Sequence, residues 1–359
     1  MNNKGINSAE AETVYEFDPR GPADRLRDLS HKFGVNLHGV IVIILLFALP
    51  FIPPFNQEHL LRWLIGAALI AAQAVAFDFT TGYINVVNFG FAAFLGVGAY
   101  TSALLAVEFG ISPWIGTFLG VIPAAALGFI TGVLTLRLRG IFAALMSWFV
   151  GLALLGLARN LTDITRGPQG LNSPTYLRTS SNLPYFYIIV VMLLVTYFVL
   201  RYITRSHIGL AFKALGQNLD AAQASGINPT FYRVFNFTVQ CAFAGWLGGF
   251  YAHYYGILTP QIMHTSHTVE VLAIAYVGGR GSIWGGAFTA FPFIFLMEFL
   301  RSNLTELPGL HLVLYGLLLI LVMIFYPGGV ANLYESVVER IGRSKEPAVR
   351  PAAGTMKST

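Results

Sequence analysis

The stretch LLRWLIGAALIAAQAVAFDFT occupies residues 60–80 and contains only two charged side chains, Arg62 and Asp78. A helix needs about 20 mostly apolar residues to cross a lipid bilayer, so this run predicts a transmembrane helix. Comparable apolar runs recur on both sides of it. They lie at about 38–55, 84–107, 113–135, 141–158, 184–203, 231–256, 268–279, 284–302 and 309–326.

The overall composition agrees with a membrane protein. Of the 359 residues, 55% are hydrophobic and only 11% are charged, and the mean hydropathy is +0.64. A soluble domain is about 25% charged, so a soluble enzyme, a disordered chain and a fibrous repeat are all disfavoured. The sequence predicts an all-α, polytopic transmembrane helical bundle with about ten crossings. One of these, the run at 268–279, is short and is expected to be a broken, tilted or re-entrant helix.

Charged residues gather at the two ends of the chain. We predict a polar cytoplasmic leader at residues 1–37, a transmembrane domain at 38–328 and a cytoplasmic tail at 329–359. The loops between helices that face the cytoplasm are enriched in Lys and Arg. With the N-terminus inside, 17 of the 22 Lys and Arg residues face the cytoplasm, so both termini are predicted there. We assign the net charge of +5 to this orientation rather than to nucleic-acid binding.

Motifs for chemistry within the chain are missing from the sequence. There is no Gly-x-x-x-x-Gly-Lys-[Ser/Thr], no His-Glu-x-x-His and no Gly-x-Ser-x-Gly. The single cysteine, Cys241, excludes a disulfide framework. His264 and His267, with His253 nearby, lack an accompanying carboxylate or cysteine and are interpreted as polar residues at a water interface. We therefore expect no enzyme activity, no cofactor and no metal in this chain.

Polar residues inside apolar runs are the candidates for function, because ionisable groups are expensive in a membrane. Asp78, Glu270 and Glu298 are the ionisable candidates, and Gln73 and Asn88 are neutral residues expected to hydrogen-bond between helices. Small residues four apart predict close helix packing. They occur at Gly116 and Gly120, Gly128 and Gly132, and Gly245 and Gly249.

The long inner loop at residues 204–230 predicts a short helix outside the membrane. Asn218 or Asp220 is suited to cap a helix over Ala221–Ser225, which Gly226 would end. The small side chains of this helix would leave a shallow surface on which another protein could dock. The loop pattern alone leaves open whether it is a docking helix or an ordinary loop helix.

The segment Asp220-Ala221-Ala222-x-x-x-Gly226 resembles the Glu-Ala-Ala-x-x-x-Gly motif of permease subunits of bacterial ABC importers. Further stretches, covering roughly residues 60–335, resemble branched-chain amino-acid permeases of the LivM type. In the first half of the chain these are Gly82-Tyr83, Asn88–Phe94, Gly96-x-Gly98-Ala99-Tyr100, Leu136–Gly140 and Thr165-x-Gly167-Pro168-Gln169-Gly170-Leu171. In the second half they are Tyr251-Ala252-His253, Pro260, Glu270, Gly278-Gly279-x-Gly281-Ser282-x-Trp284-Gly285 and Tyr326-Pro327-x-Gly329.

This resemblance implies a permease subunit of the bacterial inner membrane that translocates a small polar solute, expected to be a branched-chain or related amino acid. Its partners would be two ATP-binding cassette subunits, a second permease subunit of the same fold and a periplasmic solute-binding protein. The resemblance assigns coupling to the ATPase to Asp220, Ala221, Ala222 and Gly226. The intramembrane polar pattern and the motifs together suggest Asp78, Asn88, Phe91 and Glu270 for the translocation path.

The sequence also departs from the family pattern. Phe91 stands where a histidine is common, Arg166 replaces a usual glycine, and Asp220 replaces the glutamate of the coupling motif. The first two departures lie on or near the expected solute path and leave the solute open, with urea, short amides and small carboxylates as alternatives within the same class, whereas Asp220 keeps the charge of the coupling motif. A self-sufficient carrier or channel, using Asp78, Glu270 and Glu298, and an integral-membrane enzyme or scaffold are the rival classes. The sequence leaves open the composition of the permease pair, the role of the leader and whether Glu270 lines the path.

Overall fold

The computed structural model describes residues 37–53, 55–177, 179, 181–303, 313, 316–317, 320–321, 324–325 and 328–333. Most of the predicted leader, the last apolar run and the predicted tail lie outside these ranges. The chain separates into a unit of residues 1–44 and a unit of residues 45–359. Of the first unit, the structure describes the start of helix α2 (Leu37–Ala48), where Val40, Ile41 and Ile44 are exposed.

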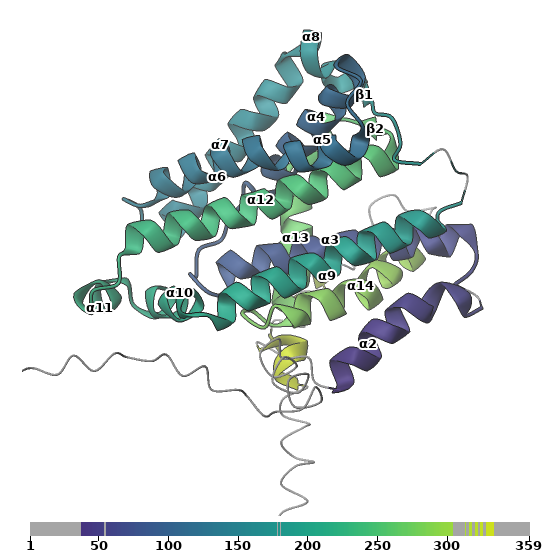
Figure 1. Cartoon of the computed structure of the whole chain (residues 1–359). Helices are drawn as coiled ribbons and strands as arrows, with labels where there is room; N and C mark the ends of the chain where they lie inside the picture. Colours follow the sequence, from purple (N-terminus) through teal and green to yellow (C-terminus); the bar gives the residue numbers. More distant parts are fainter. Residues whose placement is uncertain are drawn as a thin grey trace, which may run out of the picture. The chain divides into compact units, whose positions relative to one another are not determined.

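The described part of the second unit is helical, apart from one two-stranded sheet (Figure 1). Strand β1 (Leu171–Asn172) pairs antiparallel with β2 (Ile257–Leu258). The helices after α2 are η1 (Leu49–Phe51), α3 (Glu58–Thr81), α4 (Phe91–Glu108), α5 (Pro113–Leu119), α6 (Val121–Thr135), α7 (Ile141–Asn160), α8 (Thr162–Thr165), η2 (Gly167–Gln169), α9 (Leu183–Arg205), α10 (His207–Gln217), α11 (Leu219–Ala224), α12 (Pro229–Tyr255), η3 (Pro260–Met263), α13 (Thr265–Gly278) and α14 (Trp284–Asn303).

Five helical stretches among the described residues are long and apolar enough to cross a membrane. They are α3, α4, the combined stretch Pro113–Thr135, α7 and α9. Nine of the ten predicted runs coincide with helices, and the tenth lies mostly outside the described residues. The prediction of an all-α, polytopic membrane bundle is thus confirmed.

Two predicted helix boundaries need correction. The run at 84–107 becomes a helix only at Phe91, because the connection before it is irregular: Asn85 has φ +61°, and the Asn88 side chain accepts the Gly90 N–H at 3.1 Å. The run at 113–135 is divided at Gly120 into α5 and α6. In both places a local polar or glycine signal interrupts an otherwise continuous apolar pattern.

Helix α13 matches the expectation of a short helix in the 268–279 region. Its 14 residues correspond to about 21 Å, less than the ~30 Å hydrocarbon core of a bilayer. Irregular backbone flanks it on both sides. The loop after it carries positive φ at Gly279, Gly281 and Ile283.

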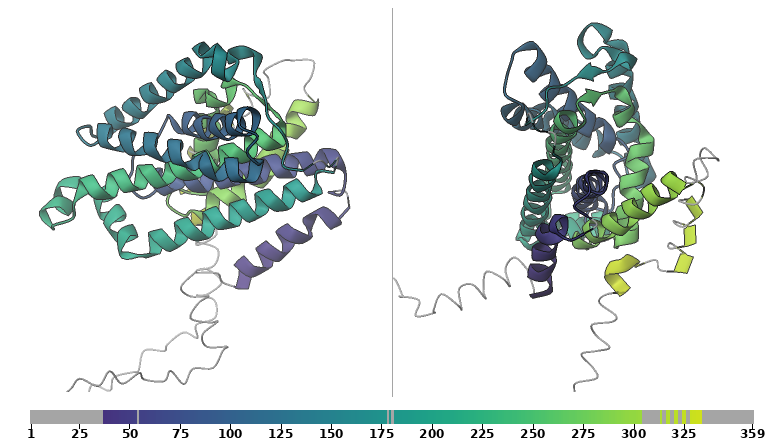
Figure 2. Two further views of the ribbon diagram at one scale, coloured as in Figure 1. Left: turned by 45° about the horizontal axis from the view of Figure 1, so that its top comes forward. Right: turned by 90° about the vertical axis from the view of Figure 1, so that its right-hand side faces the viewer.

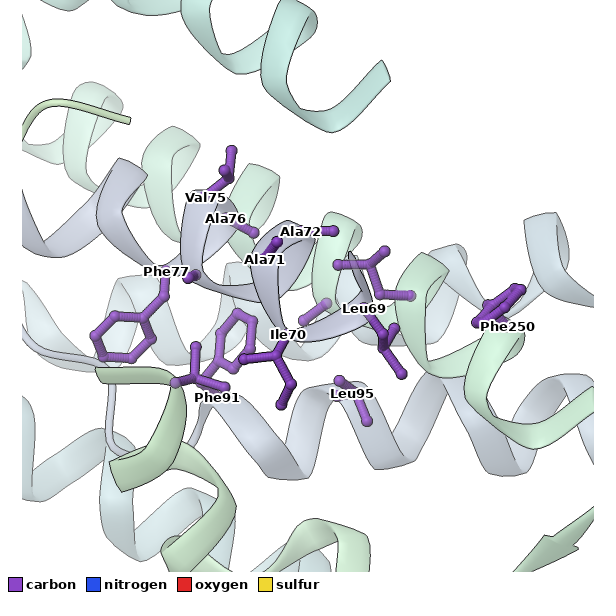
Figure 3. Close-up of a cluster of buried hydrophobic side chains, with 14 of the residues drawn as sticks. Leu69, Ile70, Ala71, Ala72, Val75, Ala76, Phe77, Phe91, Leu95 and Phe250 are labelled. Carbon is purple, nitrogen blue, oxygen red and sulfur yellow. The ribbon is translucent and has the colours of Figure 1, made fainter. Parts of the chain in front are cut away.

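Helix α3 forms the centre of the bundle and contacts α9, α12, α13 and α14 (Figure 2, right). Almost every residue from Leu64 to Thr81 is buried. Aromatic rings fill the space around it: Phe77 meets Phe91 edge to face, with ring centroids 5.5 Å apart (Figure 3). Such close enclosure explains why this run is rich in alanine.

The predicted small-residue pairs mediate close helix packing. A Cβ on Gly128 would lie 2.5 Å from the Cys241 Cβ of α12, and one on Gly249 would lie 2.9 Å from the Thr117 Cα of α5. A Cβ on Gly116, Gly120 or Gly245 would also lie within 3.0 Å of a neighbouring atom, closer than real Cβ atoms approach, and one on Gly132 would lie 3.1 Å from the Val234 Cα. These glycines therefore allow α5 and α6 to pack against α4 and α12.

Candidate functional site

Helix α11 is a short, capped helix in the long loop between α9 and α12. The Asn218 side chain accepts the N–H groups of Asp220 and Ala221 at 3.1 and 3.0 Å, which is an N-cap. At the other end, Gly226 has φ +85°, and the Ile227 N–H bonds to the Ala222 carbonyl at 3.1 Å. This left-handed glycine stop confirms the predicted helix end and selects Asn218 as the cap.

The exposed face of α11 carries the predicted coupling residues. Asp220, Ala221 and Gly226 are exposed, whereas Ala222 is 5% exposed and packs inward. Helix α10 holds the loop against the bundle, because Phe212 is buried and meets Phe79 of α3 edge to face at 5.5 Å. A small, rigid surface therefore projects from one end of the bundle (Figure 1).

An arginine in the turn between α6 and α7 fixes the start of α11. Arg139 Nη1 donates to Asp220 Oδ2 at 3.0 Å, and Nη2 donates to Oδ1 at 2.9 Å. This is the two-pronged geometry in which guanidinium and carboxylate fit best. Both side chains are exposed, so the pair contributes orientation more than stability.

The buried Arg233 of α12 holds the same turn from within the bundle. Its side chain is 4% exposed, and Nη2 donates to the carbonyls of Thr135 and Leu138 at 3.0 and 3.2 Å. Nη1 donates to the Leu136 carbonyl at 3.4 Å. The guanidinium thereby satisfies carbonyls that the end of α6 leaves without helical partners.

Asp78 lies in the last turn of α3 and is 2% exposed. Its carboxylate accepts the Gly281 N–H at 2.8 and 3.0 Å and the Ile283 N–H at 2.9 Å. Backbone N–H groups that converge in this way form a binding site for a negative charge. Asp78 therefore fastens the loop between α13 and α14 to α3, and a side chain on Gly82 would collide with that loop.

Asn88 and Phe91 lie in and beside the connection from α3 to α4, and both are buried. The Asn88 amide donates to Gln240 Oε1 of α12 at 2.8 Å, which confirms the expected hydrogen bond between segments. Tyr83, earlier in this connection, has Lys213 5.6 Å from its ring centroid. Burial raises the pKa of the Tyr83 hydroxyl.

Glu270 differs from the other predicted path residues because its side chain is 36% exposed. Its carboxylate lies 3.5 Å from His267 Nδ1 on the same face of α13. The other ring nitrogen of His267, Nε2, lies 2.8 Å from Gln73 Oε1 of α3. The expected interhelical hydrogen bond of Gln73 is confirmed. The amide nitrogen of Gln73, Nε2, is buried without a hydrogen-bond partner.

The predicted residues thus fall into two groups. The coupling residues lie on α11, and Asp78, Asn88, Phe91 and Glu270 lie around α3, α4 and α13 in the bundle. Among the described residues, no group of three His, Cys, Asp or Glu side chains could hold a metal ion. Glu298 is 3.9 Å from Arg301 on α14.

Several polar residues with clear structural roles were not identified from the sequence. Arg139 and Arg233 belong to this set, and so does Trp148, whose indole N–H donates to Thr265 at 2.9 Å. His253, interpreted from the sequence as a residue at a water interface, is instead buried, and it contacts the Ser102 hydroxyl of α4 through Nε2 at 2.7 Å and the Ser173 hydroxyl through Nδ1 at 2.9 Å. The only sequence signal for the pairing of Arg139 with Asp220 is that the two residues carry opposite charges and are both predicted to lie on the cytoplasmic side of the membrane.

Comparison with known proteins identifies the family. Residues 59–323 match the family described as the permease component of branched-chain amino acid transport systems. The chain is 29% identical over 276 residues to the high-affinity branched-chain amino acid transport system permease protein LivM of Escherichia coli K12 and to that of Salmonella typhimurium LT2. The alignment covers 69% of this chain and 64% of each relative. No solved structure matches. The chain is therefore a membrane-embedded member of the branched-chain amino-acid permease family.

Proposed function

We propose that this chain is the transmembrane permease subunit of an ATP-driven importer for branched-chain or related amino acids. Two ATP-binding cassette subunits, a second permease of the same fold and a periplasmic binding protein would complete the transporter. It would lie in a bacterial inner membrane with both termini in the cytoplasm. The family match, the names of the two relatives and the missing ATP-binding motif support this assignment.

The single observation that carries the proposal is the construction of α11. Its ends are fixed by Asn218 and Gly226, and its outer face offers Asp220 and Ala221 to a partner. A helix of six residues is too short to be stable alone, so caps and tertiary contacts must maintain it. We assign Asp220, Ala221 and Gly226 to contact with the ATPase, and Ala222, which packs inward, to holding this coupling helix against the bundle.

We propose that the path runs beside α13. Glu270 would face the solute, because its partly exposed carboxylate lies beside His267, which contacts Gln73 of the central helix α3, and a carboxylate in a membrane-spanning bundle needs polar surroundings. Asp78, Asn88 and Phe91 would build the wall of the path by holding the segments that border it. ATP binding would bias the bundle between inward-open and outward-open states through α11.

The test is purification of the tagged chain from its native membrane, followed by reconstitution of the complex in vesicles. We expect a P-loop subunit in stoichiometric amount and ATP-dependent uptake of leucine, isoleucine or valine with the matching binding protein. Uptake by the purified chain without ATP would replace the proposal with a self-sufficient carrier. ATP-dependent uptake of urea or a small carboxylate alone would retain the importer and change the solute.

The Gly226 turn provides a sharper variant. Gly226→Val should abolish ATP-dependent uptake, because a β-branched residue costs about 1–2 kcal/mol or more in the left-handed conformation. Gly226→Asn is the matched control, since asparagine adopts that conformation and nothing lies within 4 Å of a Cβ there. Equal uptake by both variants would argue against α11 as the coupling helix.

A further inference from the structure

Helix α7 and the turn before it contact the segments that carry both groups of candidate residues. At its start, α7 follows directly from the turn that contains Arg139, the partner of Asp220 on α11. The turn itself is fixed to α12 by the buried Arg233. A two-pronged ion pair therefore connects α11 to the residue that lies two positions before the start of α7.

Two turns further along, α7 meets the start of α4 and the start of α13. The Ser147 hydroxyl accepts the Phe89 N–H at 3.1 Å, and the Trp148 indole donates to the Thr265 hydroxyl at 2.9 Å. The Ala92 N–H donates to the Thr268 hydroxyl at 3.0 Å, which joins α4 to α13 directly. We call these residues, together with Gly90 and Gly151, the junction.

The junction is closely packed. A Cβ on Gly151 would lie 2.9 Å from the Gly90 Cα, and the Gly90 Cα faces the Ser147 carbonyl at a distance that leaves no room for a side chain. Asn88 lies two residues before Gly90, and Glu270 lies two residues after Thr268. Movement of α7 must therefore displace both segments that border the proposed path, because packed interfaces do not deform continuously.

The remainder of α7 is lightly held. Ile141, Phe142, Phe149 and Leu157 are 54–68% exposed in the chain, and only a third of the helix is buried. From Ile141 to Trp148 the helix advances by about 10 Å. Since helical hydrogen bonds keep it stiff over that length, α7 is suited to move as a rod.

We infer that α7 is the mechanical link between the α11 docking surface and the path, with Arg139 and Trp148 as positioning residues at its two contacts. This inference rests on the proposed function, because it needs an ATPase that moves α11. In the outward and inward states, the junction would shift together with the α6–α7 turn. Neither residue touches the solute in this arrangement.

The experiment records fluorine NMR spectra of the assembled transporter in which 5-fluorotryptophan replaces tryptophan. The Trp148 resonance is assigned as the signal that is lost in Trp148→Phe. We expect ATP to shift this resonance in the wild type and in Arg137→Gln, which removes an equal charge from the same turn. In Arg139→Gln the shift should disappear, and solute uptake per ATP hydrolysed should fall about three- to tenfold, while the ATPase stays bound.

A double variant separates transmission from independent local damage. Arg139→Gln with Trp148→Phe should lose no more coupling than the stronger single variant, because both interrupt one link. The link would be refuted if the double variant lost coupling by the product of the two single losses, or if the wild-type Trp148 resonance did not shift with ATP while uptake proceeded. Either result would leave the proposal of an ATP-driven importer unaffected. If ATP drives neither uptake nor a shift, both proposals fail.

Discussion

At the scale of single residues, Arg233 illustrates how a buried charge is accommodated by backbone alone. Arg233→Met would remove the side-chain donors to the part-buried carbonyls of Leu136 and Leu138, and would leave the Thr135 carbonyl with the Leu138 N–H alone. We expect the free energy of unfolding to fall by about 2–4 kcal/mol, seen as a lower Tm in detergent. Arg139→Met is the control and should lose less than about 1 kcal/mol, because that pair is exposed. Equal Tm values would contradict the assigned role.

Glu270 gives a second prediction at this scale. In the reconstituted transporter, Glu270→Gln should reduce uptake about tenfold without releasing the ATPase, because an amide loses the charge-assisted bond to the solute ammonium group. The same change at Glu298, which lies near Arg301, should leave uptake within twofold of the wild type. We take roughly twofold as the largest effect expected from the loss of this ion pair at the surface of the chain. Unchanged uptake in Glu270→Gln would remove this residue from the path.

At the scale of elements, close approach of helices depends on individual glycines. A Cβ on Gly248 of α12 would collide with the Leu95 carbonyl of α4, whereas nothing lies within 4 Å of one on Gly156 of α7. We expect Gly248→Leu to abolish folded protein in size-exclusion chromatography and Gly156→Leu to fold normally. Folded Gly248→Leu would show that α4 and α12 can separate, against the packing described here.

The helices and loops also show which features of the fold could be predicted from the sequence. Apolar length located the helices, and Asn218 with Gly226 located α11, because caps act within a few residues. The start of α4 was misplaced because a run of apolar residues does not reveal an Asx-type bend at Asn88. Partners distant in sequence were missed for a different reason. Arg139 and Asp220 are 81 residues apart, and Trp148 and Thr265 are 117 apart, so only the fold brings them together.

At the scale of the whole molecule, the described bundle contains two tightly packed groups. Helix α12 packs against α4 and α6, and α3 packs against α9 and α14. Polar contacts connect the groups, because Asn236 and Gln240 of α12 donate to the carbonyls of Phe79 and Phe77 of α3. Helix α7 lies beside them, and only a third of it is covered by the rest of the described chain.

The two buried charges of the described residues have an electrical consequence. Asp78 and Arg233 are held by N–H and carbonyl dipoles of the loops they fasten, so neither can travel far through a transmembrane field. One elementary charge that crossed the whole potential would change the energy by about 2.3 kcal/mol per 100 mV. With a zwitterionic solute, the working cycle should displace almost no net charge. We therefore expect uptake at constant ATP to keep its rate when an ionophore collapses the membrane potential, which sets this bundle apart from carriers that voltage drives.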